Sequence, residues 1–216
     1  LLKKKIEQKN MLLKERNRIS AELHDEVGST LTAINLLSHA AMKNTAPEMP
    51  VRQQVEKIRD NTREVMENIS DIVWSMNPEN NGFQAIRARM IDFLETVLET
   101  SEVDYTFEME DTVNELKMAS EKRRDFYLIF KEAVNNLSKY ARASRAEVKI
   151  AKAGNFISMI IRDNGVGFDD KRVKKGNGLT NMKKRAERNA GSLEIISGRA
   201  SSGKTGTLVT VQFPYT

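Results

Sequence analysis

The stretch Phe156-Ile-Ser-Met-Ile-Ile-Arg-Asp-Asn-Gly-Val-Gly167 carries the clearest structural signal in the sequence. Residues 156–162 form a strand-like run, and Asp163 follows them directly, before two glycines at alternate positions. Because glycine has no Cβ, Gly165 and Gly167 predict a tight turn where the backbone can approach a flat ligand. The Asp163 carboxylate could accept a hydrogen bond from an exocyclic amine of that ligand. A hairpin turn with an Asx motif is the alternative.

Further strand-like and helical segments surround this stretch. Alternating apolar residues predict strands, and apolar residues three and four positions apart predict helices. The predicted strands are 103–109, 146–152, 156–162, 193–197 and 207–213, and the predicted helices are 83–100, 120–140 and 179–189. Helices before and between the strands of a mostly antiparallel sheet predict an α+β two-layer sandwich, which we assign to residues 79–216.

Residues 19–78 precede this domain and show helical periodicity. Apolar and small residues follow a heptad stripe over 19–41, prolines within 44–50 end that helix, and a second stripe covers 51–76. Two long helices joined by a short loop predict an antiparallel hairpin. One hairpin leaves an apolar side in water, so we expect a homodimer with a four-helix bundle. Residues 1–18 predict a coiled-coil lead-in.

Composition excludes several functions. There is no Cys, and the two His, at positions 24 and 39, form no zinc ligand cluster. No apolar run approaches the length that spans a bilayer. The net charge of +5 is thinly spread, so we expect no nucleic-acid partner. The chain begins with Leu1 and has no signal peptide, so we expect a fragment of a longer protein.

The predicted helix 120–140 carries a second motif. Glu132 and Asn136 lie one turn apart on one face, and Lys139 and Tyr140 lie on the next turn. Mg²⁺ prefers oxygen ligands, and the Asn136 amide can supply one beside phosphate oxygens and waters. Lys139 could then contact a phosphate. An ordinary exposed polar face is the alternative.

Two further glycine segments follow. Residues 176–179, Gly-Asn-Gly-Leu, join glycines to a helix start, where free N–H groups and the helix dipole favour phosphate. The basic segment 169–175 predicts either a mobile lid over a polyphosphate or a solvated loop. Gly206 and Thr207 precede the last strand, where the Thr207 hydroxyl could line a base pocket.

In this order, the motifs resemble the N, G1, G2 and Gly-Thr boxes of the GHKL ATPase domain, from about residue 83 to the end. The matching segments are Glu132–Tyr140, Asp163–Gly167, Gly176–Gly178 and Gly206–Thr207. The resemblance implies that Asp163 recognises the adenine of ATP, that Asn136 holds Mg²⁺, and that the G2 glycines hinge a lid. The residues implied in nucleotide binding are Asn136, Lys139, Tyr140, Asp163, Gly165, Gly167, Gly176, Gly178, Leu179 and Thr207.

The stretch Glu22-Leu-His-Asp-Glu-Val-Gly28 narrows the choice within that superfamily. His24 lies one position off the heptad stripe, so we expect it to reach solvent, and Gly28 leaves space for a docking partner. An accessible imidazole has a pKa near neutrality and a nucleophilic nitrogen. Asp25 can accept from one ring nitrogen so that the other attacks phosphorus. A surface histidine on a charged helix is the alternative.

This arrangement resembles the sensor histidine kinases with a short His-Asp dimerisation domain, over essentially the whole chain. The resemblance implies transfer of the ATP γ-phosphoryl to His24, with Asp25 orienting and deprotonating it and Glu132 placing the metal's water shell. It further implies phosphotransfer to an aspartate of a response regulator receiver domain. It also implies a cytoplasmic fragment of a protein anchored in the inner membrane. Ser29 stands where phosphatase-active relatives carry Gln or His, which argues against phosphatase activity.

The sequence leaves two alternatives to a histidine kinase open. A GHKL ATPase would use Glu132 as hydrolytic base to drive a conformational cycle, but the chain ends soon after its last predicted strand. A pseudokinase would bind nucleotide and signal only through the dimeric hairpin. The intact His24, Asp25 and Asn136 argue against that second alternative.

Overall fold

The computed structural model describes residues 27–43, 50–76, 82–168, 177–198 and 206–215. The chain forms two compact units that divide between Trp74 and Ser75. The predicted domain boundary, between Pro78 and Glu79, lies outside the described residues and stays a prediction. The predicted coiled-coil lead-in also lies outside them.

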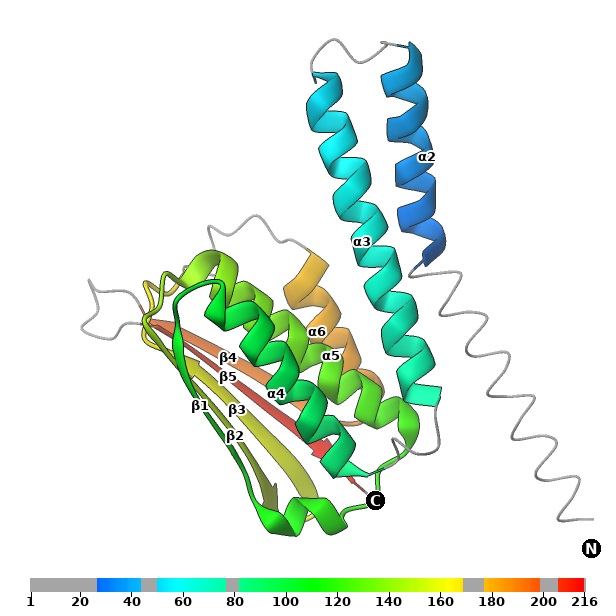
Figure 1. Ribbon diagram of the computed structural model, residues 1–216. Helices are drawn as coiled ribbons and strands as arrows, with labels where there is room; N and C mark the ends of the chain where they lie inside the picture. Colours follow the sequence, from blue (N-terminus) through cyan, green and yellow to red (C-terminus); the bar gives the residue numbers. More distant parts are fainter. Residues whose placement is uncertain (1–26, 44–49, 77–81, 169–176, 199–205, 216) are drawn as a thin grey trace, which may run out of the picture. The chain divides into compact units, whose positions relative to one another are not determined.

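The first unit contains the predicted pair of helices. Helix α2 spans Gly28–Lys43 and α3 spans Val51–Met76, and Figure 1 shows them running in opposite directions. Val65 and Ile72 of α3, seven positions apart on the predicted stripe, are buried. Other apolar side chains of both helices are exposed, namely Leu31, Leu36, Val51, Val55, Met66, Ile69 and Val73. A single copy of the helix pair therefore leaves much of its apolar surface in water.

The second unit contains a five-stranded sheet with the order β1-β2-β3-β5-β4. The strands are β1 (Asp104–Met109), β2 (Arg145–Ala153), β3 (Phe156–Asp163), β4 (Ser192–Gly198) and β5 (Gly206–Pro214). Among the strands that the structure describes, only the β1–β2 pair is parallel, which confirms the mostly antiparallel sheet. Arg162 of β3 pairs with Leu208 of β5, so the end of β3 adjoins the start of β5.

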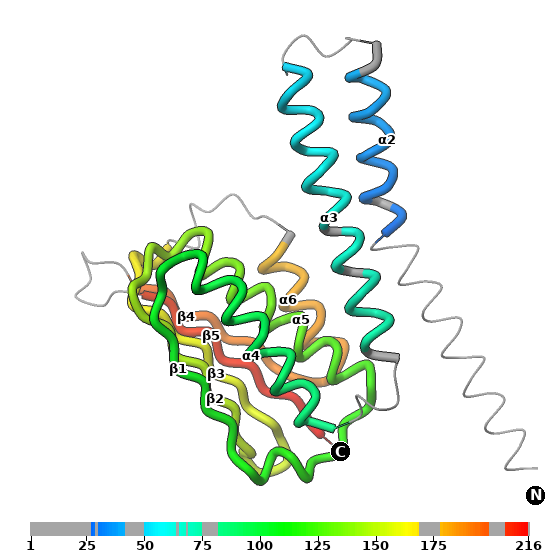
Figure 2. Tube along the Cα trace, in the orientation of Figure 1, coloured from blue at the N-terminus to red at the C-terminus, as the bar shows by residue number. Residues whose placement is uncertain are grey.

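The second layer consists of helices. Figures 1 and 2 show that they cover one face of the sheet. They are α4 (Phe83–Glu99), α5 (Ser120–Asn136) and α6 (Asn177–Arg188), with short helical turns η3 (Asp111–Glu115) and η4 (Leu137–Ala141). The predicted α+β two-layer sandwich is therefore confirmed. The predicted helix 120–140 differs in detail, because its last turn, η4, is a π-helix.

The core of this unit lies between the sheet and the helices. The rings of Phe126 in α5 and Phe213 in β5 are fully buried and meet edge to face with their centroids 5.6 Å apart. Alternate residues of β3 are buried, and Asp163 continues that row at the end of the strand. Strand alternation thus directs the Asp163 carboxylate toward the helical layer rather than toward solvent. Among the described residues, no helix combines the length and apolar character needed to cross a membrane.

Candidate functional site

A cavity of about 490 Å³ lies in the second unit. Residues of α5, η4, α6, β3, β4 and β5 and of the turn after β3 line it. This volume is typical of sites that bind small molecules or cofactors. The predicted nucleotide motifs contribute the polar part of the lining.

Apolar side chains form most of the wall. Ile161, Met182 and Val209 are buried, and the complete apolar set is Ala133, Leu137, Ala141, Ile161, Phe168, Leu179, Met182, Ile195 and Val209. Such a wall favours a flat ligand with little charge on its faces, because the ligand can leave water without losing hydrogen bonds there.

Asp163 is the buried charged residue of the lining, with 8% of its surface exposed. Its Oδ1 accepts hydrogen bonds from the backbone N–H of Gly165 at 2.8 Å and of Thr207 at 3.2 Å. Burial raises the pKa of Asp163 above its ordinary value, while the hydrogen bonds from Gly165 and Thr207 act in the opposite direction. Both backbone donors contact Oδ1, and the Thr207 side chain also hydrogen-bonds the carboxyl.

The turn after β3 requires glycine at two positions. A Cβ on Gly165 would overlap the backbone carbonyl of Ala141 in η4. Gly167 has φ of +64°, and a Cβ there would overlap the backbone carbonyl of Gly198. The N–H of Val166 donates to the Ala141 carbonyl at 2.8 Å. The turn is therefore held tightly against η4 and the end of β4, which fixes the position of Asp163.

Glu132 and Asn136 lie on the cavity side of α5, one turn apart as predicted. Asn136 Nδ2 donates to Glu132 Oε1 at 3.1 Å. This bond orients the amide so that its carbonyl oxygen remains as an oxygen ligand for a hard cation. A Cβ on Gly178 would overlap the Glu132 carboxylate, so the first turn of α6 touches α5 here. The described residues contain no cluster of three His, Cys, Asp or Glu suited to holding a metal by itself.

Most of the predicted nucleotide residues meet at this cavity. Those that line it are Glu132, Asn136, Tyr140, Asp163, Gly167, Gly178, Leu179 and Thr207. Lys139 is exposed on η4 and does not line it, and Gly165 supports the turn from behind. His24, Asp25 and Gly176 lie outside the described residues. The roles of all these residues stay predictions.

Most residues of the apolar wall are absent from the predicted site residues. Periodicity could have found part of it, because Ile161 precedes Asp163 by two positions and Val209 follows Thr207 by two, each on the same strand face. Met182 likewise follows Gly178 by one helical turn. Phe168 and Ile195 have no comparable local signal.

Ser197 of β4 was also missed. Its Oγ accepts the backbone N–H of Phe168 at 2.7 Å and lies 3.5 Å from Thr207 Oγ1. Ser197 thereby joins the turn after β3 to the start of β5 behind the cavity wall.

Comparisons with known families agree with this geometry. Residues 15–81 match the family described as "Histidine kinase". Residues 121–216 match the family described as "Histidine kinase-, DNA gyrase B-, and HSP90-like ATPase", and they include every lining residue named above.

Similar full-length proteins include two from Bacillus subtilis (strain 168). The chain is 28% identical to the sensor histidine kinase DesK over 94% of its length and 51% of that protein. It is 24% identical to the sensor histidine kinase LiaS over 95% of its length and 56% of that protein. The chain thus spans about half the length of these relatives.

Two solved structures show the same fold. The Acinetobacter baumannii histidine kinase AdeS superposes with a TM-score of 0.57 at 13% identity, covering 89% of this chain and 98% of that one. The histidine kinase domain of the Erythrobacter litoralis EL346 blue-light activated histidine kinase gives 0.55 at 15% identity, covering 94% of this chain and 93% of that one.

Proposed function

The chain belongs to the sensor histidine kinases, with a histidine kinase module followed by an ATPase module, and from this premise we propose that it transfers the γ-phosphoryl group of ATP to His24. The observation that carries the proposal is the buried Asp163 carboxylate in an otherwise apolar cavity of the ATPase module. An adenine ring offers the matching chemistry, since it has apolar faces and an exocyclic amine.

Base recognition follows from the arrangement around Asp163. Two backbone donors hold its Oδ1, and in this proposal the adenine amine donates to the same carboxylate. Ile161, Met182 and Val209 supply the apolar walls against which the ring packs. Guanine carries a carbonyl in place of that amine, so two acceptors would face each other and binding would be weaker.

The phosphate end of the nucleotide lies toward Asn136 and the first turn of α6 in this proposal. The Asn136 carbonyl oxygen suits Mg²⁺ together with phosphate oxygens and waters, which is consistent with the lack of an acidic cluster among the described residues. When bound, Mg²⁺ neutralises phosphate charge. Glu132 orients the Asn136 amide and would help to place the water shell of a bound Mg²⁺, and Lys139 would contact a phosphate.

The chemical step uses the helix pair. A ring nitrogen of His24 forms a bond to the γ-phosphorus as the bond from that phosphorus to the β,γ-bridging oxygen breaks, and ADP leaves. Asp25 orients the ring and takes its proton. The phosphoryl group then passes to an aspartate of a response regulator receiver domain.

A second copy of the chain is part of this proposal. The exposed apolar residues of α2 and α3, such as Leu36 and Val55, are covered by the same residues of a partner in a four-helix bundle. Because ATP is the substrate, we place the reaction in the cytoplasm.

Labelling with ATP that carries radioactive γ-phosphate tests the function. We expect acid-labile, base-stable label on the wild-type chain and none on His24→Gln, which should still bind ATP. Asp163→Asn should lose ATP binding and therefore label. Label that persists on His24→Gln would contradict the assignment.

The same experiment separates the alternatives. Steady release of phosphate without labelled protein would support an ATPase that uses Glu132 as base. ATP binding with neither label nor phosphate release would support a pseudokinase.

A further inference from the structure

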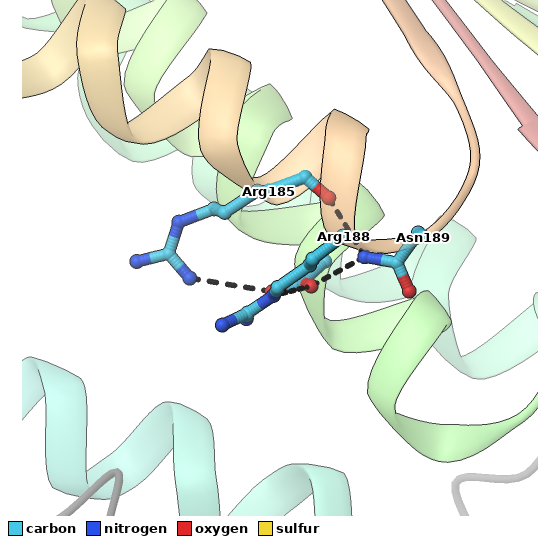
Figure 3. A network of polar contacts seen from close by, with 4 residues as sticks. Arg185, Arg188 and Asn189 are labelled. Carbon is cyan, nitrogen blue, oxygen red and sulfur yellow. Dashed lines mark hydrogen bonds and ion pairs between the residues drawn. The ribbon is translucent and has the colours of Figure 1, made fainter.

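A polar cluster joins α5 to the end of α6. The Asp125 cluster consists of Asp125 in α5 and of Arg185, Arg188 and Asn189 (Figure 3). Arg188 Nε and Asn189 Nδ2 each donate to Asp125 Oδ2 at 2.5 Å, and Arg185 Nη1 donates to Oδ1 at 3.3 Å. Arg188 Nη2 also donates to Oδ1. None of these four residues lines the cavity.

The cluster determines how the end of α6 sits on α5. Only 2% of the Asp125 side chain is exposed, and a buried carboxylate is stable only when charged or polar donors surround it. Arg188 contacts both carboxylate oxygens, a two-point geometry that constrains direction as well as distance. Asn189 Nδ2 also donates to the Arg185 carbonyl at 2.8 Å, which caps the last turn of α6.

The contact between α5 and α6 continues to the cavity, about two helical turns from the Asp125 cluster. Glu132 follows Asp125 by seven residues in α5, and Gly178 precedes Arg185 by seven residues in α6. Seven residues make about two helical turns, so each pair lies on one side of its helix, about 10 Å apart. Glu132 and Gly178 touch, because a Cβ on Gly178 would overlap the Glu132 carboxylate. The two helices are therefore in contact at both ends of this span.

We propose that Asp125 is a positioning residue for the nucleotide site. By holding the end of α6 against α5, its carboxylate sets the position of Gly178, Leu179 and Met182 at the other end of α6, where they line the cavity. A two-turn helical segment is stiff, so a change of its anchor moves its far end. This inference rests on the proposed nucleotide function of the cavity.

The test uses the full chain with Asp125→Asn, which keeps the shape of the side chain and removes its charge. Circular dichroism first identifies conditions in which the variant is folded. Under those conditions the Kd for Mg–ATP is measured, and amide hydrogen exchange of residues 178–182 is measured without nucleotide. We expect the Kd to rise about three- to ten-fold and exchange at 178–182 to quicken. The control is Glu147→Gln, which removes a charge from the partly exposed Glu147–Lys149 pair of β2 and should change neither quantity.

A purely structural role for Asp125 predicts a lower melting temperature with unchanged Kd and unchanged exchange at 178–182, and that result would overturn the proposal. If Asp125→Asn does not fold, the substitute variant is Arg188→Gln, in which Arg185 and Asn189 still donate to the Asp125 carboxylate. Arg188→Gln should raise the Kd and quicken exchange at 178–182 by less than is expected for Asp125→Asn. No change in either quantity would overturn the proposal.

Failure of the wild type to bind ATP would refute the nucleotide function instead. Exchange at 178–182 would then decide by itself whether Asp125 positions this end of α6, and unchanged exchange would refute that role.

Discussion

The two units of the chain bury their apolar residues to very different extents. In the sheet-containing unit, Phe83, Ile86 and Leu94 of α4 are fully buried. In the helix pair, Leu36 of α2 is 68% exposed and Val55 of α3 is 54% exposed. Apolar surface in water is unfavourable, so the core of the sheet-containing unit is complete within one chain while that of the helix pair is not.

This difference has a functional counterpart. Every residue that lines the cavity belongs to the sheet-containing unit, so the proposed nucleotide site needs only one copy of the chain. The proposed phosphoacceptor, His24, belongs to the sequence of the helix pair, whose exposed apolar surface is the proposed contact with a second copy. Nucleotide binding and phosphoryl transfer should therefore respond differently to protein concentration.

The largest effect is expected from Phe130→Ala, which tests whether the sheet-containing unit has a complete core. Phe130 is fully buried and its ring lies 6.0 Å from that of Phe93. Its truncation should lower the free energy of unfolding by about 3–5 kcal/mol. Urea titration at two protein concentrations should give the same loss at both. Ile196→Ala, at a site 53% exposed, is the control and should lose far less.

The next effect is expected from Val55→Glu, which tests the incomplete core of the helix pair. If a partner chain covers Val55, a charge there should weaken dimerisation by about 2 kcal/mol, or roughly 30-fold in Kd. Analytical ultracentrifugation measures this change, and ATP binding should not change. Arg63→Gln, at an exposed polar position of α3, is the matched control. A dimer that withstands Val55→Glu would place the interface elsewhere.

A smaller effect is expected from Ser197→Ala, which removes an internal bond of the sheet-containing unit. The variant leaves the Phe168 N–H without its 2.7 Å acceptor, a loss of about 1 kcal/mol. We expect ATP to bind about two- to five-fold more weakly because Phe168 lines the cavity. Calorimetric titration measures this at any protein concentration. Ser158→Ala, a half-buried β3 position outside the lining, should leave the ATP affinity unchanged.

The smallest effect is a pH dependence of stability caused by Asp163. Burial raises the pKa of this carboxyl in the folded protein above its ordinary value of 3.8, so the folded state holds the proton more strongly than the unfolded state. Its contribution to stability therefore falls as pH rises from 3.8 through the raised folded pKa. Asp163→Asn should lack this decline. Melting temperatures of the wild type and of Asp163→Asn are measured across that pH range. A difference in melting temperature that stays constant with pH would contradict this effect of burial.

The secondary structure was predicted well where apolar residues recur at regular spacing along the sequence. Helix α3 has the predicted bounds, and each predicted strand differs from the observed one by at most a residue at either end. The π-helical turn η4 was not predicted, because apolar spacing does not reveal which carbonyl each N–H contacts. The turn ends at Arg142, whose positive φ of 50° likewise has no marker in the sequence.

The polar half of the candidate site was predictable for a different reason. Asp163, Gly167 and Thr207 belong to short motifs whose residue types suit one chemistry, and their order along the chain indicated the family. The apolar half was not, since Phe168 and Ile195 resemble ordinary core residues until the sheet order brings the turn after β3 and strand β4 to one cavity.

The sequence by itself determined the helices, the strands and the nucleotide motifs, because periodicity and motif chemistry act over a few neighbouring residues. Only the tertiary structure decided that Asp125 meets Arg188, which lies 63 positions away, and that Gly178 leaves room for Glu132. Such pairs depend on how two distant helices pack on one sheet. Since many side chains are chemically able to form an ion pair, only the folded backbone selects which of them come within hydrogen-bonding distance.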